Sequence, residues 1–144
     1  MFVVFDLDGT LALIDHRRHF VAGPVKDYRA FFAACDQDQP NWPVVRALYA
    51  HLAVVGNKVE IWSGRSDEVR DKTVWWLEHY LIPSRLLKRM RPAGDTTADH
   101  VLKKSWLDQC ERKPDLIFDD RQAVVDMWRA SGITCAQVNA AEWS

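Results

Sequence analysis

The feature that most constrains the fold of this 144-residue chain is a short apolar run that stops abruptly in acidic residues. Residues 2–5 read Phe-Val-Val-Phe, and residues 6–10 read Asp-Leu-Asp-Gly-Thr. An unbroken apolar run of this length is typical of a buried parallel strand, and an acidic, glycine-containing loop is typical of a strand end. We therefore predict a strand over residues 2–5 that carries Asp6 and Asp8 to one edge of a sheet.

Two further strand candidates end in polar side chains in the same way. They are residues 58–62, which precede Ser63, Gly64 and Arg65, and residues 115–118, which precede Asp119 and Asp120. The carboxyl ends of neighbouring parallel strands meet at the same edge of a sheet, where ligands bind in folds of this class. We therefore expect the three polar clusters to converge on one site.

The rest of the chain alternates between helical and extended patterns, which predicts an α/β fold with a Rossmann-like parallel sheet and helices on both faces. The pattern indicates helices over residues 24–35, 44–55, 68–80, 97–110 and 122–131, and strands over residues 85–90 and 133–138. We read residues 11–23 as an exposed loop and residues 63–67 as a turn. We expect one domain, residues 1–144, in which residues 15–43 form a small helical lid.

The acidic residues suggest a chemistry. Four carboxylates brought together repel one another unless a cation lies between them, and Mg²⁺ prefers oxygen ligands of this kind. Asp6 would attack phosphorus to form an aspartyl phosphate, and Asp8 would protonate the leaving oxygen and then activate water. We predict that the metal ligands are Asp6, Asp8, Asp119 and Asp120, and that the hydroxyls of Thr10 and Ser63 bind phosphate oxygens.

Two other interpretations compete with this one. An Asp-x-Asp-Gly sequence is by itself a common turn. The functional interpretation therefore depends on the apolar strand before Asp6 together with the other two polar clusters, in order. A non-catalytic nucleic-acid-binding module could keep the same fold, but it would be expected to lack the nucleophile, the acid, a lysine or the metal pair. This sequence lacks none of them.

Three segments, residues 5–11, 59–65 and 116–121, resemble the first, second and fourth motifs of the haloacid dehalogenase-like phosphatase superfamily. Residues 91–96, 98–103 and 119–129 are in addition similar to the 3′-phosphatase domain of phage polynucleotide kinase. The resemblance implies that Asp6 is the nucleophile, that Asp8 is the acid/base and that Lys103 holds the phosphoryl group. It also implies that Arg17, Arg65 and Asp99 support activity, with Arg18 as the alternative to Arg17. With Thr10, Ser63 and Gly64, these residues make up the predicted substrate-binding set.

Some prominent residues have two interpretations each. Lys103 lies one helical turn after Asp99, which favours it over its neighbour Lys104 as the functional lysine. We expect Trp62, Trp75, Trp76, Trp106 and Trp128 to pack in the core, and we single out Trp42 as the candidate for base stacking. The basic residues Lys88, Arg89 and Arg91 either line a phosphate path or keep an edge strand soluble.

The composition excludes several further classes of function. Nineteen basic and 20 acidic residues give a net charge of −1, which argues against an extended footprint on duplex nucleic acid. Three dispersed cysteines, no long apolar stretch and no leader sequence favour a reduced, cytoplasmic protein without a membrane partner. No Gly-x-x-x-x-Gly-Lys-Ser/Thr loop occurs, so we expect no kinase activity from this chain. We predict an Mg²⁺-dependent phosphomonoesterase that acts on a nucleic-acid 3′ end, with free (deoxy)nucleotides as the alternative substrate.

Overall fold

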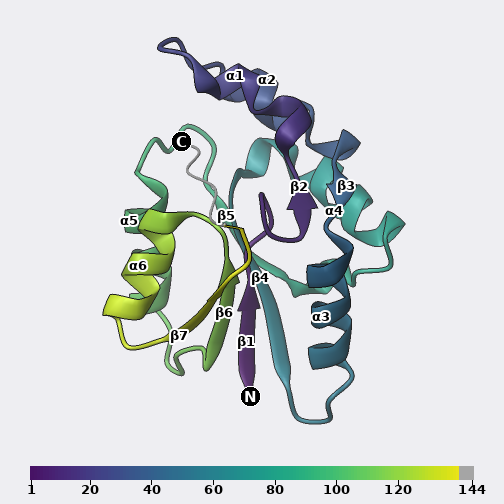
Figure 1. The fold of residues 1–144 in the computed structure, drawn as a ribbon, viewed down its shortest axis with the longest axis vertical. Coiled ribbons are helices and arrows are strands. Elements are labelled where there is room, and N and C mark those ends of the chain that lie inside the picture. Colours follow the sequence, from purple (N-terminus) through teal and green to yellow (C-terminus); the bar gives the residue numbers. More distant parts are fainter. Residues whose placement is uncertain (140–144) are drawn as a thin grey trace.

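A five-stranded parallel sheet forms the centre of the computed structural model, which describes residues 1–139 (Figure 1). The strand order is β5-β4-β1-β6-β7. The strands are β1 (Phe2–Phe5), β4 (Lys58–Ser66), β5 (Leu87–Arg91), β6 (Leu116–Asp119) and β7 (Thr134–Gln137). The predicted α/β fold with a parallel sheet is therefore confirmed.

The register of the central strands brings the predicted polar clusters together. Phe5, the last residue of β1, pairs with Ile61 of β4 and with Phe118 of β6. All three strands run in the same direction, so the residues that follow these positions meet at one edge of the sheet.

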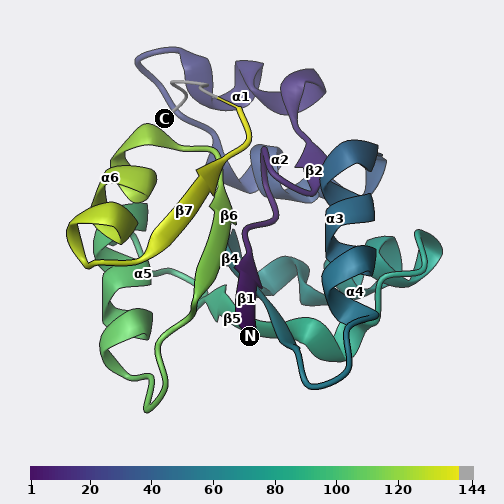
Figure 2. The same cartoon turned by 60° about the horizontal axis from the view of Figure 1, so that its bottom comes forward.

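Helices cover both faces of the sheet (Figures 1 and 2). The helices on one face are α3 (Trp42–Leu52) and α4 (Arg70–His79), and those on the other are α5 (Asp99–Asp108) and α6 (Gln122–Ala130). Side chains alternate along a strand, so Val3 and Phe5 pack toward α3 and α4, whereas Phe2 and Val4 pack toward α5 and α6. This two-sided burial explains why β1 is apolar at every position.

The segment between β1 and α3 folds over the carboxyl ends of the strands (Figure 1). It contains β2 (Ala12–Leu13), η1 (Asp15–Arg17), α1 (His19–Ala22), α2 (Tyr28–Ala33), η2 (Cys35–Gln37) and β3 (Gln39–Pro40), where η denotes a 3₁₀ helix. The β2 and β3 strands pair antiparallel, and Ile14, Val21 and Phe31 form a small core of their own. The prediction that residues 11–23 form an exposed loop is wrong, because Ile14 and Val21 turn inward onto Phe31.

Several predicted element bounds also need correction. The helix predicted over residues 24–35 covers only Tyr28–Ala33, and the helix predicted over 44–55 ends at Leu52. The predicted turn at 63–67 is wrong, because β4 continues through Ser66 in irregular pairing with β5 and the chain turns only at η3 (Asp67–Val69). A further short 3₁₀ helix, η4 (Ser84–Leu86), leads into β5.

Four of the five tryptophans predicted to pack in the core are buried. The prediction is wrong for Trp75, which is 54% exposed. Its ring lies on the outer side of α4, stacked on His79 at a centroid distance of 4.9 Å. Within residues 1–139, no helix has the length and apolar character needed to cross a bilayer.

Candidate active site

Three carboxylates gather where β1 and β6 end. Oxygen atoms of Asp6, Asp119 and Asp120 all lie within 4.8 Å of one another, and all three residues are buried. The ammonium group of Lys103, on α5, lies among them, with its Nζ 2.8 Å from Asp6 Oδ1 and 3.1 Å from Asp119 Oδ2. Lys103 is 1% exposed. The structure therefore brings residues from three distant parts of the chain into one charged cluster.

The three carboxylates of this cluster carry more negative charge than the ammonium group of Lys103 can balance. Burial, followed by repulsion from Asp119, raises the pKa of Asp6 well above its ordinary value, although Lys103 acts to lower it. Burial acts to lower the pKa of Lys103, but Asp119, Asp6 and Asp99 outweigh it and raise that pKa well above normal. One ammonium group thus does not balance the carboxylates. A set of buried carboxylate oxygens suits a hard divalent cation such as Mg²⁺.

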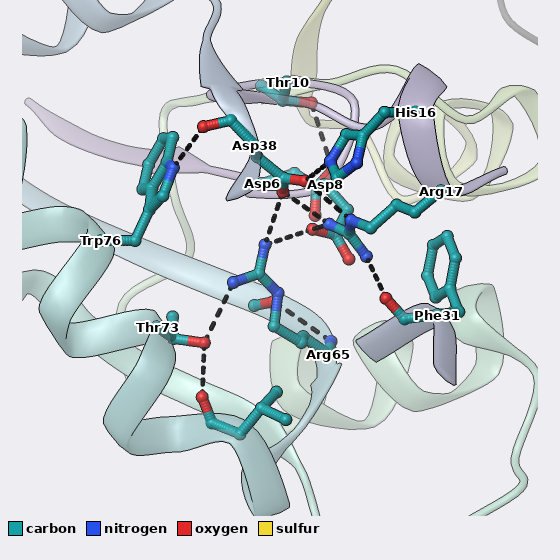
Figure 3. Close-up of polar contacts among 12 residues, drawn as sticks. Asp6, Asp8, Thr10, His16, Arg17, Phe31, Asp38, Arg65, Thr73 and Trp76 are labelled. Atoms are coloured by element: carbon teal, nitrogen blue, oxygen red, sulfur yellow. Dashed lines mark hydrogen bonds and ion pairs between the residues drawn. The ribbon is translucent and has the colours of Figure 1, made fainter. Parts of the chain in front are cut away.

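Asp8 lies two residues from Asp6 but in a different environment (Figure 3). Its Oδ1 accepts hydrogen bonds from Arg17 Nη2 at 2.7 Å and from Arg65 Nη2 at 2.5 Å. Burial acts to raise the pKa of Asp8, but the two guanidinium groups outweigh it and hold that pKa far below its usual range. The structure does not bring the Asp8 carboxylate into the group formed by Asp6, Asp119 and Asp120.

A further buried acid, Asp38, binds both arginines and was not identified from the sequence. It accepts hydrogen bonds from Arg17 Nε at 2.8 Å and Nη2 at 2.7 Å, and Arg65 Nη2 lies 3.5 Å away (Figure 3). The Asp38 main-chain carbonyl accepts a 2.8 Å bond from Trp76 Nε1 on α4. Asp38 is 1% exposed and follows η2, so it ties the segment over the strands to the site. No local pattern distinguishes it from the other polar residues of this segment.

The structure also separates the two candidate arginines of the loop. Arg17 is completely buried, and its guanidinium carbon lies 4.4 Å from the ring centroid of Phe31. Arg18 instead pairs with Asp15 at 3.4 Å, at a partly exposed position. Arg17 is therefore the arginine that reaches Asp8.

The hydroxyl-bearing residues Thr10 and Ser63 are completely buried and do not line the cavity described below, whereas Gly64 does. Thr10 Oγ1 donates to Asp6 Oδ2 at 3.1 Å, and Ser63 Oγ accepts from the Arg65 amide at 3.1 Å. Gly9 has a φ of +79°, and a Cβ there would lie 2.0 Å from Asp120 Oδ2. A Cβ on Gly64 would lie 2.0 Å from Asp99 Oδ1. Both glycines are thus needed for the close approach of the carboxylates.

Asp99 and Lys103 are neighbours on α5, as their spacing predicted. Asp99 Oδ2 lies 3.7 Å from Lys103 Nζ, and Asp99 Oδ1 lies 3.4 Å from Arg91 Nη2. Lys104, by contrast, is exposed and pairs with Asp108. Of the three basic residues near β5, Arg91 lines the site, whereas Arg89 bonds Gln109 and Lys88 is exposed.

A cavity of about 440 Å³ opens above these groups. This volume lies within the range of roughly 300–1,000 Å³ that is typical of small-molecule sites. Trp42, the predicted stacking residue, does not line it and instead packs edge-on against Tyr80, with the ring centroids 6.0 Å apart. The lining residues are Asp6, Asp8, Tyr28, Arg29, Phe31, Phe32, Gly64, Ser66, Glu68, Arg91, Gly94, Asp95, Thr96, Thr97, Ala98, Asp99, Asp120 and Arg121.

Comparison with known proteins gives a consistent result. The family model for the polynucleotide kinase PNKP phosphatase domain matches residues 1–143. A putative bifunctional polynucleotide kinase/RNA ligase of Autographa californica nuclear polyhedrosis virus is 32% identical over 131 residues. The match covers 88% of this chain and 17% of the viral protein.

Solved structures extend the comparison. A chain of the Pnkp1/Rnl/Hen1 RNA repair complex is 36% identical and superposes with a TM-score of 0.80, covering 95% of this chain and 42% of that one. A putative phosphatase from Clostridium difficile shares the fold at a TM-score of 0.59 and 16% identity, covering 94% of this chain and 83% of that one. This chain therefore spans less than half of the viral protein and of the matching chain in the repair complex.

Proposed function

Because the chain belongs to the polynucleotide kinase PNKP phosphatase domain family, we propose that it is an Mg²⁺-dependent phosphatase that removes the 3′-phosphate from polynucleotide ends. The observation that carries this proposal is the position of Asp6. Its carboxylate lines the cavity and is held by Lys103 and Thr10 in the group that contains Asp119 and Asp120.

In the first step, a carboxylate oxygen of Asp6 attacks phosphorus, and the bond between phosphorus and the 3′ oxygen breaks. Asp8 in its acid form gives its proton to that oxygen, which leaves as the 3′-hydroxyl. In the second step, Asp8, now ionised, takes a proton from water. The water oxygen attacks the aspartyl phosphate, and inorganic phosphate leaves while Asp6 is restored.

Arg17 and Arg65 hold Asp8 in its ionised form in the free protein. The proton for the first step can come with the substrate, since phosphate monoesters have a second pKa of about 6 and part of the population carries a proton at neutral pH. Transfer of that proton to Asp8 leaves the phosphoryl group as a dianion. Lys103, 2.8 Å from Asp6, then stabilises the charge that the phosphoryl group brings to Asp6.

Asp6, Asp119 and Asp120 are the side chains that would hold the metal ion. When bound, Mg²⁺ would supply positive charge that lets the nucleophile and the phosphate approach each other. The buried, acid-rich site described above fits such an ion. We propose that Asp8, engaged by two arginines, serves proton transfer and that its side chain does not bind the metal ion.

The relatives support RNA as the polynucleotide. One matching chain belongs to an RNA repair complex, and the viral relative is described as a polynucleotide kinase/RNA ligase. We accordingly propose that this phosphatase acts in RNA end repair beside a kinase and a ligase, in the cytoplasm, and that residues 15–43 act as a lid over its site. In such a series of repair reactions, removal of the 3′-phosphate would leave the 3′-hydroxyl that a ligase requires.

The test compares substrates and one matched pair of variants. The protein with Mg²⁺ should release phosphate from a 3′-phosphorylated oligoribonucleotide with a higher kcat/KM than from a panel of 3′- and 5′-mononucleotides. Asp6→Asn should reduce kcat by about 1,000-fold or more. The same change at Asp108, exposed on α5, should leave kcat unaltered. Equal use of mononucleotides would favour a nucleotide phosphatase, and an unaffected Asp6→Asn variant would refute the covalent mechanism.

A further inference from the structure

One wall of the cavity is aromatic. Tyr28, Phe31 and Phe32, all on α2, line it. The rings of Tyr28 and Phe32 are tilted by 31° with centroids 6.2 Å apart. Phe31 is buried beneath them, in contact with both rings, whereas Tyr28 is 46% exposed and Phe32 is partly exposed. Phe31 belongs to the small core with Ile14 and Val21, and Phe32 packs partly against it. Tyr28 and Phe32 nevertheless keep exposed surface that lines the cavity.

The aromatic wall is held at a fixed position relative to the reacting groups. The main-chain carbonyl of Phe31 accepts a 3.2 Å hydrogen bond from Arg17 Nη1, and Nη2 of the same guanidinium donates to Asp8 (Figure 3). The Arg17 guanidinium also lies over the Phe31 ring. A single buried side chain therefore connects α2 to the proposed acid. Asp6 and this wall line the same cavity, so a ligand with its phosphate at Asp6 can extend toward the wall.

Another part of the cavity lining is polar. It is formed by residues 94–98, which follow β5 and carry two threonine hydroxyls. Arg91 fixes this loop through bonds from Nη1 to the carbonyls of Asp95, at 3.1 Å, and Thr97, at 2.6 Å. The cavity thus offers flat apolar rings on α2, hydrogen-bonding groups on the loop and carboxylates with a lysine beneath. A nucleoside with a terminal phosphate has the same division into a flat base, a hydroxyl-bearing sugar and a charged end.

We propose that Tyr28 and Phe32 form a stacking platform for the base of the terminal nucleotide, the one that carries the 3′-phosphate. This inference rests on the proposed function and identifies the substrate-selecting surface of the same site. Arg29, which neighbours Tyr28 and also lines the cavity, adds positive charge where the strand continues toward its next phosphate. Every base has an aromatic face, so the platform accepts all four bases and rejects phosphate esters without one.

A fluorescent base at the 3′ end tests stacking without turnover. The probe is a 3′-phosphorylated oligoribonucleotide with 2-aminopurine as its last base, bound to the Asp6→Asn protein, because stacking on an aromatic ring quenches this fluorophore. We expect quenching in Asp6→Asn and in its Trp42→Ala derivative, since Trp42 lies outside the cavity. Quenching should be lost when Tyr28→Ala and Phe32→Ala are added, and Tyr28→Phe should retain it.

Turnover gives a second and separate measurement. With the active protein, adding Tyr28→Ala and Phe32→Ala should lower the ratio of kcat/KM for the oligonucleotide to kcat/KM for glycerol 2-phosphate, an ester without an aromatic ring, by about tenfold or more. An oligonucleotide whose 3′-phosphorylated terminal nucleotide lacks its base should show a similarly low ratio with the unaltered protein. Quenching that survives the double substitution, or an unchanged ratio, would overturn the platform. If instead the unaltered protein cleaves no 3′-phosphate while quenching behaves as described, the proposed function fails and the platform stands.

Discussion

Asp6 and Asp8 lie two residues apart at the end of β1, yet their surroundings have opposite charge. Asp6 faces Asp119 and Asp120 with one lysine among them, and its pKa is raised. Asp8 faces two buried guanidinium groups, and its pKa is lowered. Identical side chains in nearly the same place thus have pKa values shifted in opposite directions, because β1 ends between two clusters. The Asp6 cluster has an excess of negative charge, and the Asp8 cluster contains cations that need an anion.

This difference suits two different tasks. A carboxylate among other carboxylates favours the arrival of a cation, whereas a carboxylate held by two arginines has a defined orientation and a defined charge. Functional sites often separate the properties of two carboxyl groups by environment in this way. In this molecule, the first carboxylate is suited to metal-assisted attack and the second to proton transfer.

The largest expected effect comes from the same substitution made at the two positions. Asp8→Asn leaves Arg17 and Arg65 buried with less compensating charge, and we expect it to lower the free energy of unfolding by about 3–5 kcal/mol. Asp6→Asn removes an anion whose raised pKa shows that its ionised form is disfavoured in the fold. In metal-free buffer that variant should be at least as stable as the unaltered protein. Urea unfolding of all three proteins measures the difference, and equal destabilisation by both substitutions would contradict it.

The Asp6 cluster could be predicted from sequence, because each of its parts is a local pattern. Apolar runs before Asp6 and Asp119 indicate strands, strand ends meet at one edge, and the helical spacing of Asp99 and Lys103 places both on one side of α5. These patterns require only that the strands before Asp6 and Asp119 be neighbours in a parallel sheet, as β1 and β6 are. The prediction of a carboxylate site therefore needed no knowledge of the tertiary contacts.

The Asp8 cluster could be predicted only in part. Arg17 and Arg65 were expected from a family resemblance, but Asp38 was missed, and the loop that holds Arg17 was wrongly expected to be exposed. Arg17 becomes buried only because the chain folds back so that Phe31 and Asp38 contact it. No periodic pattern marks such a long-range contact. The prediction that Trp75 is buried was wrong for a related reason, since aromatic residues at helical spacing do not reveal how wide the buried face of α4 is.

Asp38 offers a second way to test the comparison, because it acts on Asp8 through the arginines. Asp38→Asn weakens the hold on Arg17 and Arg65, so we expect Asp8 to be misplaced and kcat to fall by about 10–100-fold. Since Asp8 is also proposed to activate water, the variant should accumulate aspartyl phosphate, which acid quenching traps. A loss of folded protein alone would not raise the phosphorylated fraction.

The matched control for this substitution is Asp36→Asn. Asp36 lies two residues away in η2, and its nearest cation is Lys72, 3.9 Å distant at a partly exposed position. We expect kcat and the phosphorylated fraction to stay at their original values. An Asp38→Asn protein that also keeps both values would show that the arginines orient Asp8 without help from the segment above the strands.

The smallest expected effect tests the excess negative charge around Asp6. We assume that Asp6, Asp119 and Asp120 bind Mg²⁺ in the folded protein and not in the unfolded chain. A Mg²⁺ concentration of about 100 times the Kd should then raise the free energy of unfolding by about 2.7 kcal/mol. For a domain of this size, that corresponds to a rise in Tm of about 5–10 °C. Asp120→Asn should remove most of the rise, because it deletes one of the three carboxylates. Thermal unfolding with Mg²⁺ and with a chelator measures it.

Asp126→Asn is the control for the magnesium experiment. Asp126 lies on α6, and its carboxylate accepts a hydrogen bond from the exposed Gln122. The variant should keep the full rise in Tm. The Asp8→Asn protein sharpens the comparison further, since the three of the four predicted metal ligands that it keeps are those of the Asp6 cluster. If it folds and still gains stability from Mg²⁺, the two clusters act separately. If its response is lost while that of Asp120→Asn persists, the metal lies on the Asp8 side and the division of tasks between the two carboxylates is wrong.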